Sequence, residues 1–120
     1  MGTKGTIEVL QAADLKAIKF HDINIIDYTA DLNTEISIAL VKVPIGAKHS
    51  KAFSERSDKY YFIKKGTILF TRADKKHMLM ENDMIIIEKG QHFEYMGITE
   101  TEMLLIHYPF YEIAYEKFVK

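Results

Sequence analysis

Short runs of alternating apolar residues, separated by glycines and turns, constrain the fold of this 120-residue chain most strongly. Ile36, Ile38 and Leu40 fall on one face of the run at 36–43, in which β-branched residues are frequent, as in a half-buried strand. Similar runs occur at 22–28, 60–71, 77–80, 84–87, 93–96 and 102–108. Short strands at a spacing of about 8–12 residues are typical of an all-β sandwich or barrel.

Two glycine-bounded segments in the middle of the chain have the spacing of a known pair of motifs. The segment from Gly46 to Gly66 matches the spacing of G-x5-H-x-H-x3,4-E-x6-G, and that from Asn82 to Gly97 matches G-x5-P-x-G-x2-H-x3-N. Asn82 stands in for a glycine, because asparagine tolerates a left-handed backbone better than most residues. Over about residues 36–109 the chain thus resembles the cupin superfamily. This resemblance implies an all-β, single-domain jelly-roll barrel, the double-stranded β-helix.

The positions that hold metal ligands in the cupin motifs carry other residue types in this sequence. Counted without gaps, the ligand positions fall on Ala52, Ser54, Lys59 and Phe93. Alanine and phenylalanine cannot coordinate a metal, and a protonated lysine repels one. We therefore expect a barrel with no bound metal and no cofactor.

We predict one domain over residues 1–120, with an N-terminal arm over 1–35 and a barrel core over about 36–109. A short amphipathic helix is expected over about 110–120, because the hydrophobic period changes after Pro109. Its apolar face would carry Tyr111 and Phe118, and its polar face would carry Glu116.

Charge and hydropathy exclude several classes of partner. Lys and Arg total 16 against 17 Asp and Glu, and no basic block suits nucleic acid. No apolar run approaches the roughly 20 residues of a membrane span, and the chain start lacks the apolar region of a signal peptide. With 0 Cys there is no thiolate site. We expect a cytoplasmic protein that binds neither nucleic acid nor membranes.

The resemblance places Lys59 inside the barrel, and Tyr61, two residues further along the strand, shares its face. A buried ammonium group is costly unless it faces a carboxylate or an anionic ligand. We therefore predict that the barrel binds a small polar or anionic organic ligand. Alternatively, the aromatic side chains simply fill the barrel. The candidate ligand-binding residues are Ser54, Lys59, Tyr61, His92, Phe93 and Tyr95.

Three functions remain open at this point. The first is a metal-free sensor or carrier. The second is a metal-independent enzyme similar to the sugar isomerases and epimerases of the superfamily, in which Lys59 or His92 would act with Tyr61 or Tyr95. The third is a metal-dependent cupin that uses shifted ligands, namely His49, Glu55, His92 and, as an optional fourth, His107.

The sequence also suggests a homodimer. Tyr60 and Phe62 point outward from a strand whose other face lines the barrel, if the predicted alternation holds. Aromatic residues on an outward face are typical of a partner surface. The predicted C-terminal helix could instead cover them within one chain.

Overall fold

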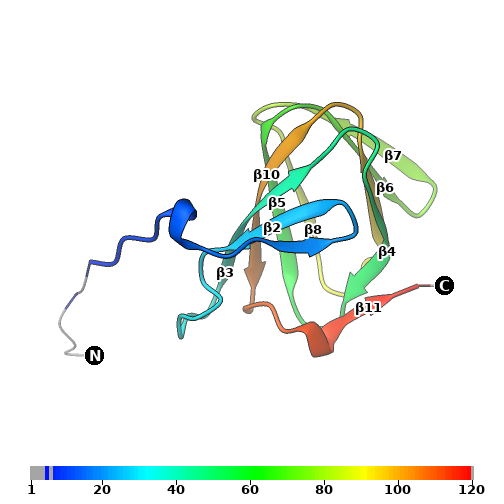
Figure 1. Ribbon diagram of the computed structural model, residues 1–120. Coiled ribbons are helices and arrows are strands. Elements are labelled where there is room, and N and C mark those ends of the chain that lie inside the picture. Colours follow the sequence, from blue (N-terminus) through cyan, green and yellow to red (C-terminus); the bar gives the residue numbers. More distant parts are fainter. Residues whose placement is uncertain (1–4, 6, 120) are drawn as a thin grey trace.

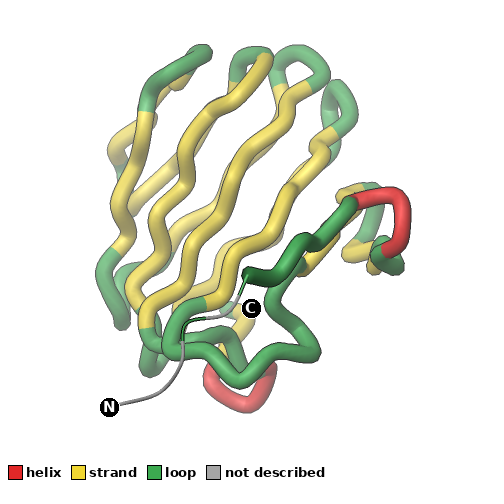
Figure 2. The backbone as a smooth tube through the Cα atoms, turned by 90° about the vertical axis from the view of Figure 1, so that its left-hand side faces the viewer, coloured by secondary structure: helices red, strands yellow, loops and turns green. Residues whose placement is uncertain are grey.

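The computed structural model describes residues 5 and 7–119, in which the chain forms two facing β-sheets (Figure 1). The six-stranded sheet has the order β1-β2-β3-β10-β5-β8. These strands span, in that order, Ile18–Phe20, Ile23–Asp27, Ser37–Val43, Thr101–Tyr108, Asp58–Lys65 and Met84–Ile87. The five-stranded sheet has the order β11-β4-β9-β6-β7, with the spans Glu116–Phe118, Lys48–Ser54, Phe93–Gly97, Ile68–Arg72 and Lys75–Leu79. The predicted all-β architecture is confirmed (Figure 2).

Side chains that alternate along the strands fill the space between the two sheets. In β5, Lys59, Tyr61 and Ile63 are buried, whereas the residues between them are partly exposed. The rings of Tyr61 and Phe70 lie 5.1 Å apart at the centre of the core. Each large apolar side chain that is fully buried contributes about 1.5–3 kcal/mol of transfer free energy. Aliphatic and aromatic side chains together therefore hold the two sheets against each other.

Two turns use the left-handed backbone that the motif spacing predicts. Gly66 has φ 89° and Asn82 has φ 73°. A Cβ atom on Gly66 would collide with the carbonyl oxygen of Glu100, so only glycine fits there. Asn82 is accommodated because asparagine adopts this conformation at a low cost.

The first 35 residues contribute strands as well as an arm. β1 and β2 pair antiparallel, and β2 continues the six-stranded sheet beside β3. Residues 7–17 extend away from the barrel and include the short 3-10 turn η1 (Ala12–Asp14) (Figure 1). Ile7 and Val9 in this stretch are 94% and 75% exposed. Residues 1–4 and 6 of the predicted arm lie outside the described residues.

The predicted C-terminal helix is wrong. A single 3-10 turn, η2 (Ile113–Tyr115), leads into β11, which pairs antiparallel with β4. The edge of β4 offers unpaired backbone groups, and their hydrogen bonds to β11 outweigh the helical pattern of a short segment. Glu116, expected on the polar face of a helix, instead points into the barrel. No helix in the described residues is long and apolar enough to cross a membrane.

Candidate ligand-binding site

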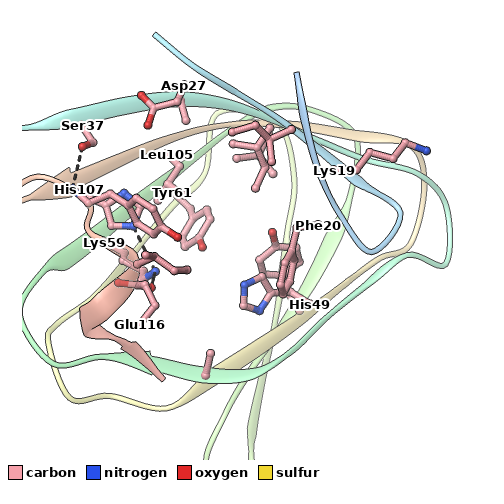
Figure 3. Close-up of a pocket in the computed structure, with 18 of the residues that line it drawn as sticks. Lys19, Phe20, Asp27, Ser37, His49, Lys59, Tyr61, Leu105, His107 and Glu116 are labelled. Carbon is pink, nitrogen blue, oxygen red and sulfur yellow. Dashed lines mark hydrogen bonds and ion pairs between the residues drawn. The ribbon is translucent and has the colours of Figure 1, made fainter. Parts of the chain in front are cut away.

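One end of the barrel contains a cavity of about 270 Å³ between the two sheets (Figure 3). β1, β2, β3, β5 and β10 line it from one sheet, and β4, β9 and β11 line it from the other. The segment that follows β10 closes part of its mouth. The polar side chains of this lining are Lys19, Asp27, Ser37, His49, Lys59, Tyr61, Tyr95, His107, Tyr111 and Glu116.

Lys59 lies at the centre of a buried polar cluster. Its Nζ donates a hydrogen bond of 2.5 Å to Glu116 Oε1 and lies 3.2 Å from His107 Nε2. The two side chains of the ion pair are 5% and 7% exposed. The ammonium group also lies 5.4 Å from the centre of the Phe93 ring. The lysine thus has a carboxylate, an imidazole and an aromatic face around it, and its charge is matched inside the protein.

Burial governs the protonation of this cluster. It lowers the pKa of Lys59, while the neighbouring Glu116 carboxylate opposes that shift. Burial and then the Lys59 charge lower the pKa of His107 to about 3. The His107 imidazole is therefore neutral at pH 7. Because an ammonium can only donate, His107 Nε2 accepts from Lys59 and the ring proton resides on Nδ1.

Glu116 retains one acceptor atom that the protein does not use. Its Oε2 is buried and has no hydrogen-bond partner within residues 5 and 7–119. Unpaired buried carboxylate oxygens are costly, so such an atom normally has an ordered water, an ion or a bound molecule as its partner. Glu116 lines the cavity, and Figure 3 shows it beside Lys59 and His107. Oε2 itself is covered by the surrounding side chains, so a ligand that donates a hydrogen bond to it would have to displace part of this cover.

His49 reaches the cavity through an irregularity in β4. His49 lies opposite Tyr95 and Ala52 lies opposite Phe93, so β4 has an extra residue between these two pairs. Such a bulge reverses the alternation of the strand. On a regular strand His49, three residues before Ala52, would lie on the outer face, and the bulge turns it toward the cavity.

The imidazole of His49 is held in one tautomer. Its Nδ1 donates a hydrogen bond of 2.7 Å to the carbonyl oxygen of Ser50, which leaves Nε2 as a free acceptor. Burial, the largest cause, lowers the pKa of His49 to about 4. The ring packs among aromatic rings, with Phe20 at 5.0 Å and Tyr95 at 4.9 Å. Figure 3 shows His49 and Phe20 across the cavity from the Lys59 cluster.

Two tyrosines complete the wall. Burial raises the pKa of both Tyr61 and Tyr95, so each hydroxyl keeps its proton at neutral pH. Their rings meet edge to face, 5.7 Å apart. The cavity thus combines neutral proton acceptors with protonated donors.

The six predicted ligand residues divide into three groups. Lys59, Tyr61 and Tyr95 line the cavity, whereas Ser54 and Phe93 are buried beside it. The Ser54 hydroxyl accepts the backbone N–H groups of residues 56 and 57, at 3.2 and 2.9 Å, and so caps a turn. His92 is exposed and stacks on Phe53 at 4.5 Å. Ligand binding by all six stays a prediction.

Sequence reasoning missed Glu116 as a cavity residue and gave His107 only a minor part. His107 could have been found from its strand, because Met103, Leu105 and His107 alternate on one buried face. Glu116 gave no such signal, since its segment has a helical pattern.

The residues at the metal positions of the cupin motifs do not suit a metal ion. The buried Lys59 ammonium repels a cation, and it neutralises the charge of the Glu116 carboxylate beside it. The shifted set proposed from the sequence is also dispersed. His49 and His107 line the cavity, whereas Glu55 and His92 are exposed. No group of three metal-binding side chains occurs in the described part of the chain.

No protein-family model matches the sequence, and no curated protein matches it. Solved structures do match. Pac13 from Streptomyces, a nucleoside dehydratase, is 20% identical at a TM-score of 0.85, over 96% of this chain and 92% of that chain. Its structures with uridine include variants with a histidine changed to glutamine or a tyrosine changed to phenylalanine.

Two further matches have different descriptions. A predicted oxalate decarboxylase from Thermotoga maritima is 14% identical at a TM-score of 0.75, over 85% of this chain and 99% of that chain. The cupin domain of Cnp3 from Schizosaccharomyces pombe is 13% identical at a TM-score of 0.70, over 82% and 72% of the two chains. The two-sheet barrel and these matches agree with the resemblance seen in the motifs. The chain has the fold of the cupin superfamily.

Proposed function

We propose that the cavity binds an uncharged, hydroxyl-bearing organic molecule of the nucleoside class and acts on it by acid–base chemistry that uses no metal. The observation that carries this proposal is the unpartnered Glu116 Oε2 in the cavity wall. A ligand hydroxyl would donate to this atom, and a ring would pack on the aromatic side chains opposite.

The charges of the lining favour an uncharged ligand over an anionic one. Glu116 already neutralises Lys59, and Asp27 adds a second carboxylate. Lys19 is exposed and points away from the cavity (Figure 3). A phosphate or carboxylate would therefore meet no free buried cation among the described residues, and its desolvation would be uncompensated.

The site also has the components of an elimination reaction. His49 Nε2 would take a proton from a carbon next to a carbonyl group, and that electron pair would form a carbon–carbon double bond. The hydroxyl on the next carbon would then leave as water, with a proton from Lys59 or a tyrosine. Pac13, the structural neighbour that is a nucleoside dehydratase, supports this reaction class. Its variants with uridine alter histidine and tyrosine, the residue types found in this wall.

Titration calorimetry with uridine and uridine 5′-monophosphate tests the ligand class. We expect uridine to bind about tenfold more tightly or better, because the unpaired phosphate costs more than about 1.4 kcal/mol. Tighter binding of the monophosphate would overturn the uncharged-ligand proposal.

A binding-only role as a sensor or carrier is the second candidate, since the same pocket would serve it. Mass spectrometry after incubation with compounds that carry a hydroxyl group β to a carbonyl separates the two. Loss of water that depends on the protein supports the enzyme, whereas tight binding without turnover supports the carrier.

We also propose that two copies pair through the outer face of the six-stranded sheet. Leu104 lies between Leu40 and Phe62 in the registers of β3, β10 and β5, and Ile106 lies between Ile38 and Tyr60. Met84 and Ile86 extend both rows onto β8. These side chains are partly or fully exposed, apart from Leu40 at 8%. A continuous apolar face across four neighbouring strands is typical of a partner surface.

The cytoplasmic location stays a prediction.

A further inference from the structure

Glu116 reaches the cavity only because the C-terminal segment, residues 109–119, is held against the barrel. Backbone hydrogen bonds join Glu55 N to Tyr115 O at 2.9 Å and Val119 N to Lys51 O at 2.9 Å. The Ser57 hydroxyl donates to Pro109 O at 2.7 Å. The β4–β5 turn therefore forms much of the surface on which the segment rests.

Arg56, in this turn, has the most extensive contacts with the segment. Its guanidinium carbon lies 4.6 Å from the Phe110 ring centre and 4.5 Å from that of Tyr115. One terminal nitrogen donates to Phe110 O at 2.6 Å, and the other donates to Glu112 Oε1 at 3.3 Å. A planar guanidinium suits this combination of stacking and forked donation, which an ammonium cannot reproduce.

The same turn also fixes the partner of Glu116. The Ser54 hydroxyl accepts the N–H groups of Arg56 and Ser57, and β5 begins directly after them. Lys59 lies three residues beyond Arg56. Arg56 thus joins both halves of an ion pair whose members are 57 positions apart in the chain.

We propose that Arg56 is a positioning residue, which sets the Glu116 carboxylate against Lys59 and leaves its second oxygen free for a ligand. Arg56 does not line the cavity, so it acts through Glu116. The positioning of Glu116 does not depend on a ligand, but its effect on binding rests on the function proposed above. Two measurements keep these parts separate.

The first measurement needs no ligand. The groups around the Lys59 ammonium are Glu116, His107, the Phe93 ring and, at longer range, His49. Of these, Glu116 raises the pKa of Lys59. NMR titration of isotopically labelled lysine in Arg56→Met should show the Lys59 pKa about one unit below wild type, in the direction of Glu116→Gln. Methionine keeps an apolar stem between the two rings, so the fold is retained.

Lys117→Met is the matched control. Lys117 belongs to the same segment and forms an exposed ion pair with Glu55 at 3.7 Å, so its loss should leave the Lys59 pKa unchanged. Arg56→Lys should give a value between those of wild type and Arg56→Met. An unchanged Lys59 pKa in Arg56→Met, or an equal fall in Lys117→Met, would overturn the positioning role.

The second measurement is a double-mutant cycle on uridine binding. Arg56→Met and Glu116→Gln should each weaken binding about tenfold, as expected for a lost hydrogen bond to a charged group. The double variant should bind no more weakly than Glu116→Gln alone, because Arg56 acts through Glu116. Additive losses would contradict the proposal. If wild type does not bind uridine, the ligand class is wrong, and the Lys59 pKa still decides the role of Arg56.

Discussion

Lys59 and Glu116 form a buried ion pair of 2.5 Å between β5 and β11, 57 positions apart in the chain. The pair brings the C-terminal strand into the barrel wall and places the Glu116 carboxylate, with one unpartnered oxygen, in the lining of the cavity. It also changes what substitutions at Lys59 should do. If the Lys59 ammonium were buried without a partner, Lys59→Met would leave the fold intact or more stable. With Glu116 as its partner, the same change leaves a buried carboxylate unpaired.

Breaking the pair from either side should destabilise the fold. Glu116→Leu leaves the Lys59 ammonium buried without a partner, and we expect a loss of about 3–5 kcal/mol in the free energy of unfolding. The double variant Lys59→Met with Glu116→Leu should recover most of that loss. Denaturant unfolding of wild type, Glu116→Leu and the double variant measures these differences. Glu55→Leu, from an exposed pair, should cost less than about 1 kcal/mol. A double variant as unstable as the single one would show that the pair itself is not the cause.

Acid should weaken the fold through His49 and His107. Their pKa values fall from an ordinary 6.5 to about 4 and about 3. Between pH 6.5 and these lowered pKa values, the two histidines bind protons in the unfolded chain but stay neutral in the folded protein. The contribution of the two neutral histidines to the free energy of unfolding is fully present above pH 6.5. It falls as the pH drops toward 4, by up to about 1.4 kcal/mol per pH unit for each histidine.

His107→Gln should flatten this pH dependence of the unfolding free energy. His77→Gln, at an exposed position, is the control and should leave the slope as it is in wild type. Equal slopes in wild type and His107→Gln would show that His107 is not buried in neutral form.

How far the site could be foreseen depends on strand regularity. The resemblance places Lys59 inside the barrel, and strand alternation extends the inner face to Tyr61 and Tyr95; all three are buried. Alternation fails for His49, because a bulge adds a residue and no local signal in β4 marks it.

The C-terminal segment shows a second limit. Its helical spacing is real, but a segment this short follows its tertiary contacts rather than its own propensity. Backbone pairing with β4 and the ion pair between Glu116 and the buried Lys59 determine its conformation. Neither partner is near Glu116 in the sequence, so local pattern could not predict that Glu116 lies in the wall.

His49 and His92 should differ sharply on replacement. His49→Gln keeps a polar side chain but removes the acceptor nitrogen that is proposed to take the proton. The rate of water loss from compounds with a hydroxyl group β to a carbonyl should fall at least about a hundredfold, while uridine binding changes little. His92→Gln is the control, because His92 lies on the surface against Phe53. A loss of turnover in His92→Gln equal to that in His49→Gln would contradict the assigned site.

A charge on the outer sheet face should separate the proposed dimer. Ile106 lies at the centre of the apolar face, next to Ile38 and Tyr60, and Ile106→Lys places a charge there. Light scattering at micromolar concentration should give a dimer for wild type and a monomer for this variant, because an unpaired charge would be buried at the interface. Met78→Lys, exposed on β7 of the other sheet, should remain a dimer. A monomeric wild type would rule out the pairing.

The most direct test of the account is a crystal structure of the wild-type protein soaked with uridine. We predict uridine in the cavity, with a hydroxyl group donating to Glu116 Oε2 and a ring packed beside Phe20 and His49. Uridine bound elsewhere, or a cavity that contains only water at saturating uridine, would contradict it.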